Sequence, residues 1–179
     1  MATPSTIFTI GHSTHPIEEF IDILKAHGVR RLVDVRTIPK SRKNPQFWSD
    51  ALAASLREAG ITYRHVKDLG GLRHRRKGSP NGAWRNASFQ GYADYMLTEE
   101  FNTAVDDLLS RGHDNDLAIM CAEAVPWRCH RSLIGDALLV RGAKVLDIFS
   151  KTSAKPHTLT SFARVDGKRI TYPPESADA

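Results

Sequence analysis

The chain has 179 residues, of which 41% are hydrophobic and 25% are charged, a composition that excludes wholesale disorder. No apolar run approaches the roughly 20 residues of a membrane span, and the first residues lack the basic-then-apolar pattern of a secretory signal. Two cysteines are too few for a disulfide framework. We therefore expect a cytoplasmic protein with free thiols and no membrane partner, folded as one domain over residues 1–179 with its core at 7–150.

The net charge of +5 is unevenly distributed. Residues 64–85 hold seven of the 25 basic side chains and one of the 20 acidic ones, so the remainder of the chain is almost balanced. Concentrated positive charge attracts polyanions, whereas evenly spread charge mainly favours solubility. This distribution predicts an anionic ligand, a nucleic acid or a nucleotide.

Apolar runs alternate with amphipathic stretches in chain order. Expected strands lie at 7–10, 31–35, 61–65, 117–120 and 144–149, and helical patterns begin near residues 16, 45, 88, 98 and 131. This alternation predicts an α/β fold: one three-layer domain with a mostly parallel five-stranded sheet flanked by helices. In the C-terminal arm, 151–179, residues 168–172 are expected to form an edge strand or a docked segment.

Ligands of open parallel sheets bind beyond the carboxyl ends of the strands. Most residues capable of chemistry follow expected strands and are therefore expected to meet at one edge. The candidate catalytic residues are Ser13, Asp34, Cys121, Glu123, Cys129 and His130. The candidate substrate-binding residues are His12, Arg36, His65, Arg75, Arg76, Lys77, Trp84 and Arg131.

Two of these segments have a structural and a functional interpretation. The backbone N–H groups of Gly11-His12-Ser13 could hold an anion, or the segment could be a plain turn and helix cap. Asp34, inside an apolar strand, needs a partner such as Arg36 or Arg131. It is either a satisfied ion pair that fixes the loops or a general base that orients a histidine.

The segment from Cys121 to Arg131 is the densest in reactive groups. Cys129-His130-Arg131 opens a helix, where a thiol acquires a lowered pKa and nucleophilic character. The spacing from Cys121 to Arg128 resembles a cysteine-dependent phosphatase loop but is one residue too long, lacks glycines and contains Glu123, so we disfavour that chemistry. The alternative for both cysteines is burial as small apolar groups.

The long segment after the third strand combines glycines, cations and one aromatic residue. Arg75, Arg76 and Lys77 suit phosphates, and Trp84 suits a stacked base. We expect either a lid over a bound polyanion or a solvated surface loop. A metal site made from His12, Cys121, Cys129 and His130 is a minority hypothesis, because their spacing is not that of a familiar ligand set.

Several motifs agree, in order, with one family. They are residues 9–13 (TIGHS), 32–36 (LVDVR), 60–63 (GITY), 69–71 (LGG) and 120–131 (MCAE with Pro126 and CHR). Over 7–149 the chain resembles the uncharacterised bacterial family called domain of unknown function 488. The resemblance implies a cytoplasmic α/β domain without a settled activity or cofactor, and its motif residues include Ser13, Asp34, Arg36 and Glu123. Some smaller relatives lack the cysteine pair, which favours these four as shared polar machinery.

Three functions remain open at this point. The leading one is an enzyme-like domain that binds a nucleic acid or a nucleotide, with thiol or acid–base chemistry at the carboxyl edge of the sheet. The second is a non-catalytic nucleic-acid-binding or regulatory module. The third is a metal- or cofactor-binding protein, with the identity of the metal or cofactor unknown.

Overall fold

The computed structural model describes residues 4–41 and 43–175. The strands are β1 (Thr6–Gly11), β2 (Arg31–Asp34), β3 (Thr62–His65), β4 (Leu117–Cys121), β5 (Lys144–Ser150), β6 (Ser153–Pro156), β7 (Arg164–Asp166) and β8 (Arg169–Thr171). The helices are α1 (Ile17–Ala26), α2 (Ser49–Glu58), α3 (Ala87–Tyr95), α4 (Glu99–Arg111) and α5 (Arg131–Val140). Three short 3-10 turns are η1 (Pro45–Phe47), η2 (Lys67–Leu69) and η3 (Pro126–Arg128). Both limits expected for the domain, residues 1 and 179, lie outside the described residues.

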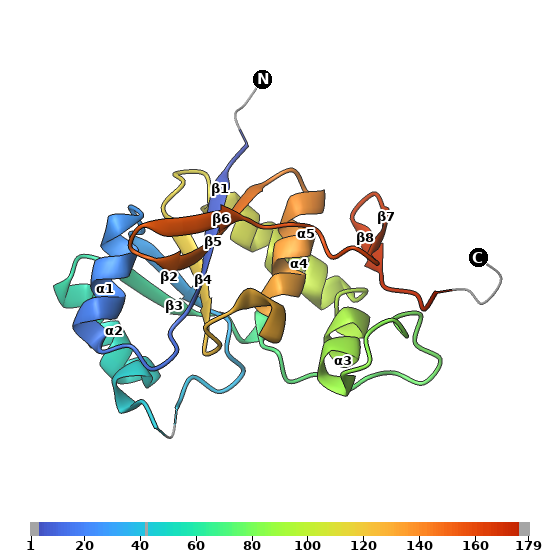
Figure 1. The fold of residues 1–179 in the computed structure, drawn as a ribbon, viewed down its shortest axis with the longest axis horizontal. Coiled ribbons are helices and arrows are strands. Elements are labelled where there is room, and N and C mark those ends of the chain that lie inside the picture. Colours follow the sequence, from blue (N-terminus) through green and yellow to red (C-terminus); the bar gives the residue numbers. More distant parts are fainter. Residues whose placement is uncertain (1–3, 42, 176–179) are drawn as a thin grey trace.

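The main sheet confirms the α/β prediction and adds one strand. Its order is β3-β2-β4-β1-β5-β6, and the first five strands are parallel. The sixth, β6, runs antiparallel to β5 after a tight reversal (Figure 1). The sequence Ser153-Ala-Lys-Pro156 is short, mostly polar and at the sheet edge, so it lacks the apolar pattern that reveals a strand.

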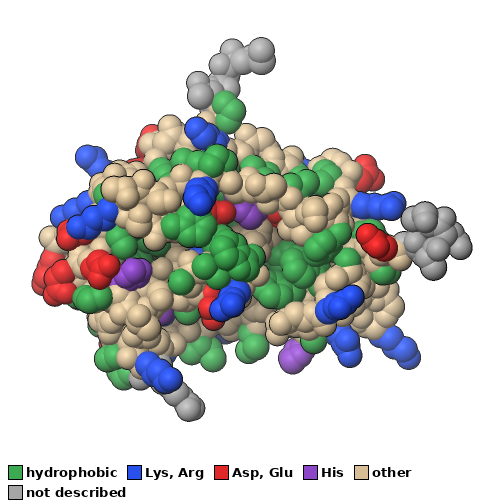
Figure 2. Space-filling model, in the orientation of Figure 1, with side chains coloured by type: hydrophobic (Ala, Val, Ile, Leu, Met, Phe, Trp, Pro, Cys, Tyr) green, Lys and Arg blue, Asp and Glu red, His purple; other side chains and the backbone are tan. Residues whose placement is uncertain are grey.

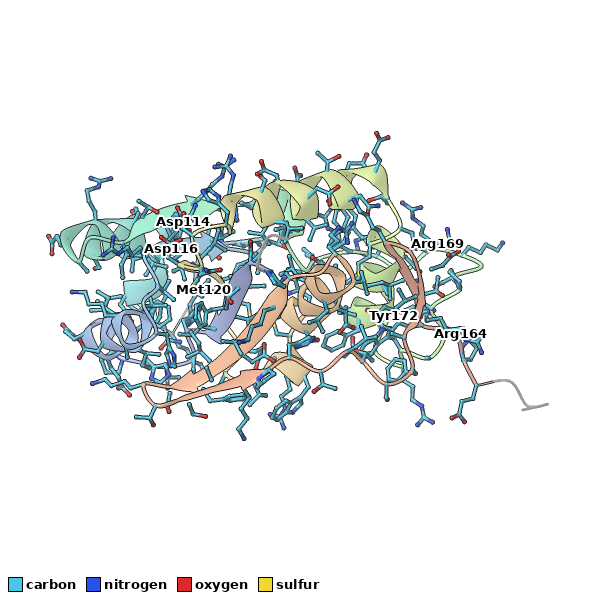
Figure 3. The ribbon with its side chains drawn as sticks, turned by 90° about the horizontal axis from the view of Figure 1, so that it is seen from above. Asp114, Asp116, Met120, Arg164, Arg169 and Tyr172 are labelled. Atoms are coloured by element: carbon cyan, nitrogen blue, oxygen red, sulfur yellow. The ribbon has the colours of Figure 1, made fainter. Side chains whose placement is uncertain are left out.

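Residues 168–172 do not join the main sheet, as an edge strand would. Arg169–Thr171 forms β8, which pairs with β7 in a separate hairpin. Tyr172 then points inward, and its hydroxyl donates to Asp136 of α5 at 2.8 Å, while Arg164 and Arg169 stay at the outer end (Figure 3). The segment is therefore docked through Tyr172, the second of the two expected arrangements.

Helices cover both faces of the sheet because the central strands β1, β2 and β4 have buried apolar side chains on both sides. On one face, Phe8 and Leu32 pack with Phe20 of α1 and Leu56 of α2. On the other, Ile7 and Val33 pack with α4 and α5. Figure 1 shows the same layers, with α1 and α2 on one side and α4 and α5 on the other.

After the neighbouring strands β2 and β4, the chain continues on opposite faces of the sheet. The segment after β2 leads to α2 on one face, and the segment after β4 leads to α5 on the other. Such a switch point opens a crevice at the carboxyl ends of the two strands, where ligands of this fold class bind. No helix in the described ranges is long and apolar enough to cross a membrane.

Candidate functional site

A pocket of about 430 Å³ opens at this switch point. We call it the thiol pocket because both cysteines line it. Its lining residues come from the ends of β2 and β4, from η3 and the residues after it, from the ends of the basic segment (residues 69–85) and from the start of α3: Arg36, Thr37, Gly71, Leu72, Asn86, Ser88, Phe89, Cys121, Ala122, Glu123, Arg128, Cys129 and His130. The carboxyl edge of the sheet thus brings the two thiols, Glu123, His130 and Arg36 together, as the sequence predicts.

Arg131 lies beneath the pocket and is the largest fully buried side chain in the described part of the molecule. Its Nη1 donates to the Cys121 sulfur at 3.8 Å, and its Nη2 donates to the Ala124 carbonyl at 3.2 Å. Within residues 4–41 and 43–175 no carboxylate pairs with it, and its Nε has no hydrogen-bond partner. A buried cation without an anion is costly, so this environment favours a negative charge on Cys121.

The pKa values of the two thiols move in opposite directions. Burial raises the pKa of Cys121, but a hydrogen bond from Cys129 and the charge of Arg131 outweigh it and leave this pKa below its ordinary value. Burial and the neighbouring Cys121 raise the pKa of Cys129 well above its ordinary value. Of the two thiols, Cys121 is therefore the one that loses its proton first; in its protonated form its Sγ donates to the Glu123 carbonyl at 3.8 Å.

His130 is held neutral beside Cys129. Its Nε2 donates to the Val35 carbonyl at 2.9 Å, which leaves Nδ1 as an acceptor 3.5 Å from the Cys129 sulfur. Burial lowers the pKa of His130 to about 4. Gly71 makes room for the ring, because a Cβ there would lie 2.5 Å from Nδ1. The glycine of the LGG motif therefore serves close packing against the imidazole.

Asp34 forms a buried ion pair instead of a free base. Arg36 donates to both of its carboxylate oxygens, at 2.7 Å to Oδ2 and 2.9 Å to Oδ1. Tyr63 adds a hydroxyl hydrogen bond of 2.6 Å to Oδ2. Asp34 is 0% exposed, so it positions Arg36 at the pocket wall and does not meet a ligand. Of the two interpretations of Asp34, the geometry supports the structural one.

His12 completes this cluster. Its Nδ1 donates to the Ser13 carbonyl at 2.8 Å, and its Nε2 accepts from Arg36 at 3.3 Å. Burial and the charge of Arg36 lower the pKa of His12 to about 4. The ring stacks on Phe47 at 4.3 Å. His12 is thus a neutral support for Arg36, outside the pocket lining.

The backbone of Gly11-His12-Ser13 is not an anion site. The N–H groups of His12 and Ser13 already donate, at 2.9 Å each, to the carbonyls of Cys121 and Ala122. A Cβ on Gly11 would lie 1.6 Å from the Glu123 carbonyl oxygen. The motif is the turn expected in the alternative interpretation, and it clamps the segment after β4 against β1. Ser13 lies outside the thiol pocket lining.

His65 is also outside the pocket, because its Nε2 donates to the Arg36 carbonyl at 2.6 Å. Two contributing residues were not predicted. Arg128, the only cation between the two cysteines in the sequence, lies exposed in the pocket wall. Tyr63 was visible within the GITY motif, but its partner across the sheet could be identified only from the register of β2 and β3.

The basic segment is packed on α3 and does not lie over the pocket. Buried Asp94 accepts from the Arg76 backbone N–H at 2.7 Å and from the Asn81 side chain at 2.8 Å. Only the ends of the segment line the pocket, so Arg75, Arg76 and Lys77 are exposed elsewhere. The expected lid is therefore an anchored surface loop. The helix that follows is capped by Asn86, two residues earlier than the expected helix start.

Trp84 is separated from these three cations. Its ring stacks on Phe89 at 5.0 Å and meets the edge of Phe162 at 4.9 Å. Part of its surface faces a different cavity, described below.

Residues 4–41 and 43–175 contain no preformed metal site. No three His, Cys, Asp or Glu side chains there are grouped to hold an ion. His12 is bound to Arg36 and Ser13, and His130 to Val35, so both histidines of the minority hypothesis are already engaged.

Comparison with known proteins yields one match. A family model described as "Domain of unknown function DUF488" matches residues 16–138, more than half of the chain. The match includes β2, β3, β4 and most of α5, and with them the whole lining of the thiol pocket. Neither the curated proteins nor the solved structures contain a match.

Proposed function

The chain belongs to the DUF488 family, whose description gives no function, and we propose that it is a thiol-dependent enzyme acting on an anionic substrate in the thiol pocket. The observation that supports this proposal best is the pairing of Arg131 with Cys121. A fully buried guanidinium that has a sulfur, and no carboxylate, as its nearest anionic group favours an activated nucleophile.

Cys129 supports the charge on Cys121. Its single thiol proton has two acceptors within reach, the Cys121 sulfur and Nδ1 of His130. Donation to Cys121 stabilises the thiolate, and His130 keeps Cys129 oriented through the hydrogen bond to Val35. In this assignment Cys121 is the nucleophile and Cys129 is a positioning residue.

We assign Arg128 and Arg36 as the residues that bind the negatively charged group of the substrate. Arg128 is exposed, lines the pocket and forms none of the ion pairs found among the described residues. Arg36 is 7% exposed and already compensated by Asp34, so its contribution is the smaller one. An arginine suits a phosphate or carboxylate because its donors bind two oxygens at once.

The chemical step is a group transfer. The Cys121 thiolate attacks the electrophilic atom beside the anionic group, a bond from sulfur to that atom forms, and the leaving group departs with its bonding electrons. Water then attacks the same atom, the bond from sulfur to that atom breaks, and Cys121 returns to the thiolate, while the proton lost by the water passes to the departed leaving group. Glu123, exposed in the pocket wall, is assigned as the base that takes the proton of this water.

The test is protection of Cys121 from alkylation, measured by peptide mass spectrometry. Phosphate, sulfate and nucleoside monophosphates are added before a small reagent such as iodoacetamide. At least one anion is expected to slow modification of Cys121, and Arg128→Ala should weaken that protection. Arg85→Ala removes an exposed arginine outside the pocket and is the matched control. Equal alkylation rates with and without every anion would refute the proposal.

The basic segment favours a second candidate function, nucleic-acid binding. Arg75, Arg76 and Lys77 are exposed on a backbone that Asp94 holds in place, and they form none of the ion pairs found in the described ranges. Figure 2 shows Lys and Arg side chains projecting at the lower right of the molecule, the end where Figure 1 places this segment. A fixed group of unpaired cations suits phosphate contacts.

This candidate is tested by titrating labelled oligonucleotides at several salt concentrations. Replacing the three cations with alanine is expected to weaken binding and to reduce the salt slope by about 3, one for each lost phosphate contact. Replacing Arg30, Arg57 and Lys144, exposed cations outside the segment, is the control. Equal binding by the segment variant and the wild type would refute a role for the segment.

A further inference from the structure

A second cavity, of about 370 Å³, lies on the far side of η3 from the thiol pocket. It is formed by η3, the end of β5 and the chain after β6, together with Trp84 from the basic segment. The two cavities share no lining residue. Figure 2 shows a hollow in the middle of this face, bordered by hydrophobic side chains, with a histidine and acidic groups inside it. We call this cavity the aromatic pocket.

Its walls include two tryptophan rings, one held in place by its neighbours and one largely exposed. Trp84 is fixed, because it stacks on Phe89 and contacts Phe162 and Tyr172 within 5.5 Å. Trp127 is 65% exposed, and its ring centroid lies 6.4 Å from that of Phe149. A large exposed indole beside a pocket is the surface that a planar ligand covers most effectively.

The floor is charged but internally satisfied. His157 donates from both ring nitrogens, to Asp147 and to Asp136, at 3.0 Å each. Burial lowers the pKa of His157, but these two hydrogen bonds outweigh it and raise the pKa to about 9. Asp147 also accepts from Thr9, and Asp136 from Tyr172. The floor therefore has little capacity left to bind a charged group.

Lys155 is the cation at the mouth of this pocket. It is exposed, lies 5.6 Å above the ring of Phe149, and forms none of the ion pairs found in the described ranges. Its ammonium group already occupies the face of Phe149 that a cationic ligand would use, and it would repel such a ligand. Lys155 therefore favours an anionic substituent on the ligand.

Trp84 lines the pocket with the part of its indole that stays accessible, because its Nε1 is buried and out of reach of a ligand. An aliphatic acid would make little use of these aromatic walls, whereas a planar ring can stack on them.

We propose that the aromatic pocket binds a nucleotide, with the planar base against Trp127 and the phosphate at Lys155. Three observations support this proposal. The walls are aromatic, the charged groups of the floor already bind one another, and Lys155, at the mouth, has no ion pair among the described residues. This site does not depend on the thiolate of Cys121, so the two proposals can fail separately.

The test is calorimetric titration with AMP, GMP, CMP and UMP, with the matching nucleosides and ribose 5-phosphate in parallel. At least one nucleotide is expected to bind more tightly than its nucleoside and than ribose 5-phosphate. Trp127→Ala should weaken binding about 5- to 150-fold, the range expected for one stacked base. Lys155→Ala should remove the advantage of the nucleotide over the nucleoside.

Two control variants test which pocket the nucleotide occupies. Trp48 is 40% exposed and outside both pockets, so Trp48→Ala is expected to bind as the wild type does. Cys121→Ser is expected to bind nucleotide normally. Absence of binding by all four nucleotides, equal binding by Trp127→Ala and the wild type, or loss of binding in Cys121→Ser would overturn the proposal. The last result would transfer the nucleotide to the thiol pocket.

Discussion

His157 gives the sharpest stability prediction. It bridges two buried carboxylates, Asp136 and Asp147, from two different elements. Its pKa is about 9 in the folded protein, against 6.5 for an unperturbed histidine. A raised folded-state pKa stabilises the protein fully below pH 6.5, and this stabilisation is lost as the pH rises through about 9. The difference corresponds to about 3 kcal/mol at pH 6 and almost nothing at pH 10.

The perturbation is His157→Gln, which keeps hydrogen-bonding capacity but removes the charge. Its free energy of unfolding is measured by urea denaturation at pH 6 and pH 10, beside the wild type. We expect the destabilisation to be larger at pH 6 by about 3 kcal/mol, because at pH 10 the wild-type histidine is itself neutral. His113→Gln, at an exposed position, is the control and should show no such difference.

Comparing each variant with the wild type at the same pH removes the contribution of titrating groups that do not contact His157. A destabilisation of His157→Gln that is equal at pH 6 and pH 10 would refute the assignment of a positive charge to His157.

Three further predictions concern the supports of the thiol pocket. His12 and His130 have pKa values of about 4, because burial disfavours their charged forms. The unfolded chain therefore takes up these protons first, and stability should fall between pH 6.5 and 4 by up to about 3 kcal/mol per histidine; a flat urea profile in this window would contradict it. Gly71→Ala would place a Cβ 2.5 Å from His130 and should cost about 1–3 kcal/mol, measured by urea unfolding; an unchanged midpoint would show that the ring can move away. Tyr63→Phe removes the 2.6 Å hydrogen bond to Asp34 and should cost about 1–3 kcal/mol; thermal melts equal to the wild type would argue against a buried network.

The layers and the location of the site could be predicted from the sequence because both follow from strong periodic signals. The parallel strands are continuous apolar runs, and strand direction alone assigns Cys121 and Arg36 to one edge. β6 has no comparable signal, because only its polar backbone pairs with β5 at an exposed edge.

The roles of individual residues depended on contacts between distant segments. Asp34 is a structural ion pair only because Tyr63 and Arg36 converge on it, and the first comes from a neighbouring strand. The GHS segment looked like an anion-binding turn, but its N–H groups are used by carbonyls more than 100 residues away. Arg36 is predicted from the sequence as a partner of Asp34, but neither Tyr63 nor the carbonyls that bind the GHS segment can be identified from the residues nearby in the sequence.

The aromatic pocket also depends on contacts between segments that are distant in the sequence. Trp84, Trp127 and Phe149 are far apart in the sequence and converge through the packing of η3 against β5 and the basic segment. Trp84 was expected to stack on a base as part of a cationic loop. In the structure it is a fixed wall of the aromatic pocket, and the base of the proposed nucleotide stacks on Trp127 instead.

The central claim is that Arg131 holds Cys121 as the reactive thiolate while Cys129 keeps its proton. The direct measurement is the pH dependence of iodoacetamide alkylation at each cysteine, followed by peptide mass spectrometry. We predict that Cys121 reacts before Cys129 and reaches half of its maximal rate below pH 9, the ordinary thiol value. Earlier modification of Cys129, or a midpoint for Cys121 at or above pH 9, would contradict the account.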